Sequence, residues 1–169
     1  AAKFWICKRA LAFTGECMEV WGGNGYVETG PMARLYREAP VNSIWEGSGN
    51  VMCLDVLRAM SRETEGFAQL LRELDDAASA HPALAQQVRT LKQLLAAPEE
   101  EREACARRLV QQLVLALQGM LMLRHAPQES AEAFLASRSD GDGARVYGAL
   151  DGTTLGVQQA ILERAWPVA

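Results

Sequence analysis

The alternation of apolar and polar residues predicts helices along almost the whole chain. Residues 3–21 place apolar side chains broadly on one side of a helix, and further apolar residues widen that stripe, which indicates burial on more than one face. Three glycines within residues 22–25 end this helix. Residues 22–47 are predicted to be mostly irregular, with a short helical turn near 32–38, and long ordered loops are where binding and catalysis concentrate.

The next predicted helix runs from residue 49 to about residue 61, with Ser48 as its N-cap and apolar residues nearly all round, which is typical of the middle of a bundle. From Gly66 onward the helices are amphipathic, so we expect a first domain over residues 1–62 and an appended helical domain over residues 63–169. No segment predicts a strand, so the fold class is all-α. The signals in the appended domain are apolar stripes within 67–74, 84–95 and 109–121, Pro98 and Pro127 as helix starts, a turn after Ser139, and a last helix that follows Thr153 or Thr154 and buries Val157, Ile161 and Ala165.

Composition and charge narrow the class of protein. Apolar residues make up 49% of the chain, which argues against disorder, and no apolar run approaches the roughly 18 residues of a membrane span. The net charge is −4, and neither half is the strongly basic module that favours non-specific DNA binding. The four cysteines form no CxxC pair and the two histidines are far from them in sequence, so no metal site is predicted. We interpret the cysteines as buried, reduced thiols of a cytoplasmic protein.

Candidate chemistry is concentrated between residues 18 and 50. The glycines of residues 22–25 let the backbone turn or approach a ligand closely. Glu46 stands beside Gly47 immediately before a helix N-terminus, where backbone N–H groups favour an anionic or electron-rich ligand atom. Each motif alone is more typical of a helix stop or a capped turn, and the Rossmann fingerprint is absent because these glycines follow a helix rather than a strand.

In this order and spacing, however, the motifs resemble the C-terminal helical domain of the acyl-CoA dehydrogenase family. The segments that carry the resemblance are Met18-Glu19-Val20-Trp21-Gly22-Gly23-Asn24-Gly25-Tyr26, Arg34-Leu35-Tyr36-Arg37-Glu38 and Ile44-Trp45-Glu46-Gly47-Ser48-Gly49-Asn50. The resemblance covers roughly residues 3–62, and its details look most like the alkylation-response (AidB-like) subfamily, which carries an extra helical domain. It implies an incomplete acyl-CoA dehydrogenase C-terminal helical bundle followed by an appended helical domain.

The resemblance also implies roles for individual residues. Glu46 aligns with the base that removes the α-proton of an acyl-CoA thioester, its backbone N–H would bond the thioester carbonyl, and Gly47 would leave room for the substrate. A base for this chemistry needs shielding from water, here between Trp45 and a flavin ring. The positions that match FAD contacts are Ser48, Gly49 and Asn50, together with Glu19, Val20, Trp21, Gly22 and Gly23, which would reach the FAD of a neighbouring subunit. Glu19 stands where the family has Gln, so its carboxylate either alters that contact or faces Arg34 or Arg37 instead.

The implied function is FAD-dependent α,β-dehydrogenation of acyl-CoA thioesters, with an electron-transfer acceptor as a partner and a dimer or tetramer of identical chains. The alternative is an AidB-like, DNA-associated alkylation-stress flavoprotein with weak or no dehydrogenase activity, although the charge does not support DNA binding. The chain has no initiator Met and opens inside an amphipathic pattern, so we expect a piece of a longer protein that does not hold FAD by itself.

Two other features are interpreted as ordinary surface. Asp140 and Asp142 suggest a calcium loop, but the spacing that follows them does not fit the EF-hand pattern, so a surface turn is predicted. The pairs Arg107-Arg108 and Arg124-His125 are interpreted as solvated helix faces rather than phosphate ligands.

Overall fold

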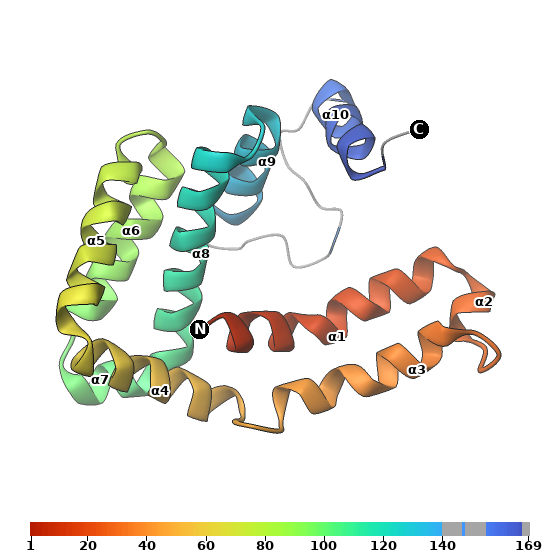
Figure 1. Ribbon diagram of the computed structural model, residues 1–169, viewed down its shortest axis with the longest axis horizontal. Helices are drawn as coiled ribbons and strands as arrows, with labels where there is room; N and C mark the ends of the chain where they lie inside the picture. Colours follow the sequence, from red (N-terminus) through yellow and green to blue (C-terminus); the bar gives the residue numbers. More distant parts are fainter. Residues whose placement is uncertain (140–146, 148–154, 167–169) are drawn as a thin grey trace. The chain divides into compact units, whose positions relative to one another are not determined.

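The computed structural model describes residues 1–139, 147 and 155–166, and every element in this part of the chain is helical, as predicted (Figure 1). The predicted turn after Ser139, with Asp140 and Asp142, and the predicted start of the last helix at Thr153 or Thr154 lie outside the described residues. In chain order the elements are α1 (Ala2–Val20), α2 (Gly23–Tyr26), α3 (Pro31–Glu38), the 3-10 helix η1 (Ala39–Ser43), α4 (Gly49–Arg62), α5 (Thr64–Ala78), α6 (Pro82–Leu95), α7 (Glu99–Ala104), α8 (Ala106–His125), α9 (Gln128–Ser139) and α10 (Leu155–Ala165).

The chain forms two compact units. The first consists of Ala1–Thr64 and Ala97–Val114, and the second of Glu65–Ala96 and the described residues from Leu115 onward. Helix α7 and the first half of α8 therefore pack with the residues that carry the family motifs. The predicted domain boundary near residue 62 divides the segment that resembles the family from the appended helices, and it is not a boundary between the two compact units. It stays a prediction.

In the first unit, α1 lies alongside α3 and η1, and α4 packs near the start of α1 (Figure 1). The core of this unit joins α1, α4 and α8, because Phe4, Met52, Cys53, Ala106, Val110 and Val114 form one buried cluster. Only one side of α4 is buried there, and the Val51 side chain is 47% exposed. The prediction of a central, all-round buried α4 is therefore wrong for this unit, since α1 and α8 cover a single face of it.

The segment 22–47 is more regular than the sequence predicts. Helix α3 begins at Pro31, whose fixed φ suits a first helical position, and η1 continues directly from it. Arg37 makes a two-point ion pair with Glu28, and Arg34 Nε pairs with Glu38 Oε1 at 2.8 Å. Both arginines therefore already pair with carboxylates other than that of Glu19. These ion pairs argue against the interpretation that Glu19 faces Arg34 or Arg37.

The helix predicted to start at Pro98 is interrupted. Pro98 is the N-cap of α7, and the three glutamates that follow it complement the positive end of the helix dipole. Cys105 then leaves helical geometry, with φ −103° and ψ 17°, and α8 starts at Ala106. Each short segment can follow its own direction, which lets Ala106 and Val110 reach the core of the first unit.

The second unit is built from α5, α6, the second half of α8, α9 and α10. Gly119 of α8 allows close packing, because a Cβ there would lie 3.0 Å from Leu135 Cδ2 and 3.2 Å from Leu84 Cδ1. His81 caps α6 by accepting a hydrogen bond from the Ala83 N–H at 3.2 Å. Helix α10 contacts α9 but has no fully buried residue, and Ala165 is exposed rather than buried as predicted.

Candidate functional site

The loop before α4 has an unusual backbone at the candidate base. Glu46 has a φ of +54°, and among the described residues it is the only non-glycine with positive φ. Gly47 follows with a φ of +116°, a conformation that side chains rarely adopt. A left-handed residue without glycine costs about 1–2 kcal/mol, and such strain tends to persist at functional sites. The sequence marked both residues, but not their backbone geometry.

A lysine from α1 holds the peptide that precedes Glu46. Lys3 Nζ donates a hydrogen bond to the Trp45 carbonyl oxygen at 2.6 Å. The Trp45 carbonyl and the Glu46 N–H belong to the same planar peptide unit and point in opposite directions. Lys3 therefore fixes the direction of the Glu46 N–H, and its charge polarises that peptide.

The N-terminus of α4 presents donors without an internal partner. Ser48 has the extended backbone of an N-cap, but its hydroxyl caps nothing. The first N–H that bonds back to Ser48 is that of Met52, at 2.9 Å, so the N–H groups before it lack a partner within the helix. Ser48 and Asn50 are exposed, whereas Gly49 is buried.

Two cations lie at this helix start. An added Cβ at Gly49 would lie 2.6 Å from Lys8 Cε and 2.7 Å from Arg107 Nη2, so the ends of both basic side chains lie against this glycine. Arg107 Nε donates to Asn50 Oδ1 at 2.6 Å. Within the described residues neither Lys8 nor Arg107 has an ion-pair partner. Helix N–H donors and cations without an ion-pair partner suit an anionic cofactor that also carries carbonyl oxygens. FAD has both negative charge and carbonyl oxygens.

The positive charges at this helix start also affect the Cys53 thiol. Cys53 is fully buried in the core of the first unit. Burial raises the pKa of the Cys53 thiol, and the positive charges of Arg107 and Lys8 oppose that rise. Cys53 is thus a neutral core residue, as predicted, whereas Cys7, Cys17 and Cys105 are only partly buried, so the prediction of burial is wrong for these three.

The glycine-rich segment is open to solvent. Its five predicted cofactor ligands are all exposed: Glu19, Val20, Trp21, Gly22 and Gly23. An added Cβ would meet no atom within 4 Å at Gly22 or Gly23, so space there is free for a ligand or a neighbouring chain. Gly25 differs, because a Cβ there would lie 2.1 Å from the Met18 carbonyl oxygen.

The structure places the two groups of predicted cofactor ligands apart. Residues 48–50 lie beside Lys8 near the start of α1, whereas residues 19–23 lie at its far end (Figure 1). At a rise of about 1.5 Å per residue, Lys8 and Glu19 are separated by about 16 Å along the helix. The Glu46 side chain is exposed in this chain.

Three residues of this site carried no signal in the sequence. Lys3 meets Trp45 across 42 positions, and Arg107 meets Asn50 across 57. Arg107 and Arg124 are both exposed, as predicted for solvated helix faces, but each also has a partner: Arg107 bonds Asn50, and Arg124 Nη1 donates to Glu73 Oε2 at 3.2 Å. Lys8 could not be told from any other exposed lysine without the position of Gly49.

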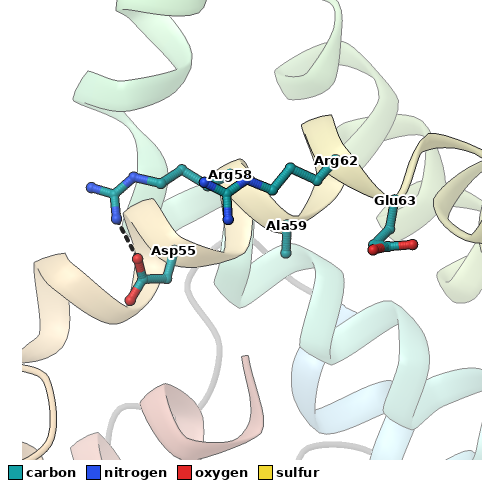
Figure 2. Close-up of a pocket in the computed structure, with 5 residues that line it drawn as sticks. All are labelled: Asp55, Arg58, Ala59, Arg62 and Glu63. Atoms are coloured by element: carbon teal, nitrogen blue, oxygen red, sulfur yellow. Dashed lines mark hydrogen bonds and ion pairs between the residues drawn. The ribbon is translucent and has the colours of Figure 1, made fainter.

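A surface pocket lies along the last turns of α4. Figure 2 shows its lining residues, in which Arg58 pairs with Asp55. The pocket is lined by Asp55, Arg58, Ala59, Arg62 and Glu63. Its two basic and two acidic residues balance formally, so the pocket by itself does not identify a phosphate or nucleic-acid site.

The described residues form neither a metal site nor a membrane span. No group of His, Cys, Asp or Glu there could hold a metal ion. No helix in the described part of the chain is both long and apolar enough to cross a membrane.

Comparison with known proteins confirms the resemblance. Residues 1–61 match the family model "Acyl-CoA dehydrogenase, C-terminal domain". The protein named "Putative acyl-CoA dehydrogenase AidB" of Escherichia coli (strain K12) is 45% identical over 134 residues, covering 79% of this chain and 24% of that protein. Acyl-CoA dehydrogenase family member 11 of Caenorhabditis elegans is 44% identical over 59 residues, or 35% of this chain and 10% of that protein.

A mitochondrial short/branched chain specific acyl-CoA dehydrogenase of Bos taurus is 31% identical over 62 residues, which are 37% of this chain and 14% of that enzyme. The chain thus spans a quarter or less of the length of these curated relatives. The match to AidB runs past the family domain into the appended helices, since 134 aligned residues exceed the 61 of the family model.

Proposed function

We propose that the full-length protein is an FAD-dependent enzyme that oxidises acyl-CoA thioesters with Glu46 as its base, because residues 1–61 belong to the acyl-CoA dehydrogenase family. The observation that supports this most is the loop before α4, where Glu46 stands in a left-handed conformation between a clamped peptide and a helix N-terminus. A loop without a ligand to position would have no need of that strain.

In the proposed reaction the Glu46 carboxylate takes the α-proton of the thioester. The electron pair of the broken C–H bond forms the α,β double bond as the β-carbon loses a hydride. The chemistry supplied by a bound FAD is acceptance of that hydride. Oxidation of a carbon acid requires a base positioned at hydrogen-bond distance and a means of stabilising the developing enolate oxygen.

The Glu46 N–H is the proposed donor to the thioester carbonyl. Lys3 holds the other end of that peptide unit through the Trp45 carbonyl, at 2.6 Å. A cation on the carbonyl draws electrons from the amide and makes its N–H a stronger donor. We therefore assign Lys3 as a positioning residue for the enolate-stabilising donor.

The same proposal gives the cofactor two groups of ligands. Ser48, Gly49 and Asn50 would contact one FAD. Glu19, Val20, Trp21, Gly22 and Gly23 would contact the FAD of a neighbouring subunit, because about 16 Å of α1 separates the groups and the glycine-rich segment is exposed. A dimer or tetramer, a cytoplasmic location and an electron-transfer acceptor that reoxidises the flavin complete the proposed assembly.

The test is Glu46→Gln in the full-length protein. The substitution keeps the shape and the backbone N–H but removes the base, so anaerobic flavin bleaching by a panel of acyl-CoA thioesters should slow by about 10²–10⁴-fold. Glu100→Gln is the matched control, since it changes an exposed carboxylate on α7 that has no proposed role in the site and should leave bleaching intact. Bleaching by Glu46→Gln at the wild-type rate would show that the base lies elsewhere.

A second candidate function is a DNA-associated stress flavoprotein with weak or no dehydrogenase activity. The match to AidB through most of the appended helices favours this subfamily, whereas the net charge of −4 and the balanced pocket on α4 give no support to phosphate binding. Binding of the full-length protein to duplex DNA across a salt series separates the two. A steep decline of affinity with salt supports the second function, and absence of binding at low salt removes it.

A further inference from the structure

Arg107 lies on α8, beyond the segment that matches the family domain, yet it reaches the proposed flavin loop. Its Nε donates to Asn50 Oδ1 at 2.6 Å. Its Nη2 lies so close to Gly49 that a Cβ there would be 2.7 Å away. The contact belongs to the first unit, which contains both Asn50 and the start of α8.

This contact decides what Asn50 can offer to a ligand. The Asn side chain has one oxygen, which accepts hydrogen bonds, and one NH₂ group, which donates them. A guanidinium donates only, so a flipped amide would set donor against donor at 2.6 Å. Arg107 thereby holds the Asn50 oxygen toward α8 and leaves the Asn50 NH₂ as the group available for a ligand.

We propose that Arg107 is a positioning residue of the flavin site: it fixes the Asn50 amide so that Asn50 donates to an acceptor atom of FAD, and it makes this site depend on the helices outside the family domain. The inference rests on the proposed function, because it takes residues 48–50 as cofactor ligands. The acceptor is an FAD oxygen or ring nitrogen, since the Asn50 NH₂ group that points away from Arg107 is a donor.

The experiment measures the dissociation constant of FAD for the full-length apoprotein by fluorescence titration, with Arg107→Met, Asn50→Ala, the double variant and Arg107→Lys. Arg107→Met should weaken FAD binding about 10-fold, which is the effect of about 1.4 kcal/mol. The double variant should lose clearly less affinity than the sum of the two single losses, because Arg107 acts through Asn50. Arg107→Lys should recover part of the affinity, and Arg108→Met, which alters the adjacent exposed cation, should leave it unchanged.

Asn50→Asp separates orientation from folding. It keeps the oxygen that Arg107 bonds, so the apoprotein should unfold at or above the wild-type temperature, but it removes the donor, so FAD affinity should fall at least 10-fold. Full FAD affinity in Asn50→Asp or in Arg107→Met would overturn the proposal while leaving the dehydrogenase function intact. Additive losses in the double variant would also overturn it. A wild-type protein that binds no FAD would instead overturn the proposed function, and this inference with it.

Discussion

At the scale of single residues, a few positions combine a proposed functional role with an unusual backbone conformation or a specific contact. Glu46 adopts a left-handed conformation that its neighbour Gly47 shares, and Lys3 fixes the peptide before it. The ends of the Lys8 and Arg107 side chains lie against Gly49. A carboxylate, a helix N-terminus and two cations from three different helices are thus placed around residues 46–50, a combination of charges suited to an anionic cofactor and a carbonyl substrate.

The glycines after α1 have unequal roles, which substitution by alanine should reveal. Gly25→Ala should destabilise the first unit by about 1–3 kcal/mol, since its Cβ would lie 2.1 Å from the Met18 carbonyl oxygen and the backbone must shift. Gly23→Ala is the matched control and should change stability little, because its φ is ordinary and its Cβ meets no atom. Urea unfolding of the two variants checks this, and equal stability of both would show that the α1–α2 turn relaxes freely.

At the scale of helices, close packing in the second unit leaves a buried polar side chain with incomplete hydrogen bonding. Gln87 of α6 is 5% exposed, and its Nε2 donates to the Arg138 carbonyl oxygen at 3.3 Å. Within the described residues its Oε1 has no hydrogen-bond partner. A buried polar atom without a partner costs about 1–3 kcal/mol, whereas the single hydrogen bond gains about 1 kcal/mol.

Gln87→Met should therefore leave the stability of the protein unchanged or raise it by up to about 1 kcal/mol. The substitution removes both the unpaired oxygen and the one hydrogen bond while keeping the side-chain volume. Gln87→Ala should cost about 2 kcal/mol or more, because it opens a cavity beside Leu84 and Gly119. Thermal unfolding distinguishes them, with the exposed Gln86→Met as a neutral control. A large loss in Gln87→Met would mean that an ordered water satisfies the oxygen.

At the scale of the whole molecule, the proposed cofactor ligands form two separate groups rather than one complete site. The loop at residues 48–50 and the segment 19–23 lie near opposite ends of α1. The first unit also leaves large apolar side chains at the surface, among them Ile6, Val20, Trp21, Ile44 and Trp45. Exposed apolar surface of this kind marks regions that bind other protein surfaces.

We therefore expect this chain alone to self-associate and to release FAD. Added FAD should elute separately from the protein in gel filtration, because neither group of ligands can enclose the cofactor. Light scattering should show an average mass that rises with protein concentration. A yellow, stoichiometric flavin complex of this chain, or a strictly monomeric mass at all concentrations, would contradict the respective expectation.

Much of the fold followed from local pattern. Helical periodicity predicted α1 and α4 closely, because the spacing that gives a helix its apolar stripe is written in neighbouring residues. The same local logic failed where a helix could continue or break at little cost. The helical turn predicted near 32–38 is α3, but the short helices α2 and η1 formed where irregular backbone was predicted, and Cys105 divided α7 from α8.

The sequence by itself determined the all-helical class, the family of residues 1–61 and the candidate residues around Glu46, since these depend on residue identity and spacing along the chain. Only the tertiary structure decided how those residues are supported. Lys3 reaches Trp45 and Arg107 reaches Asn50 because α1, α4 and α8 share one core. Such contacts depend on how distant helices pack, and an exposed lysine or arginine carries no periodic signal that reveals its partner.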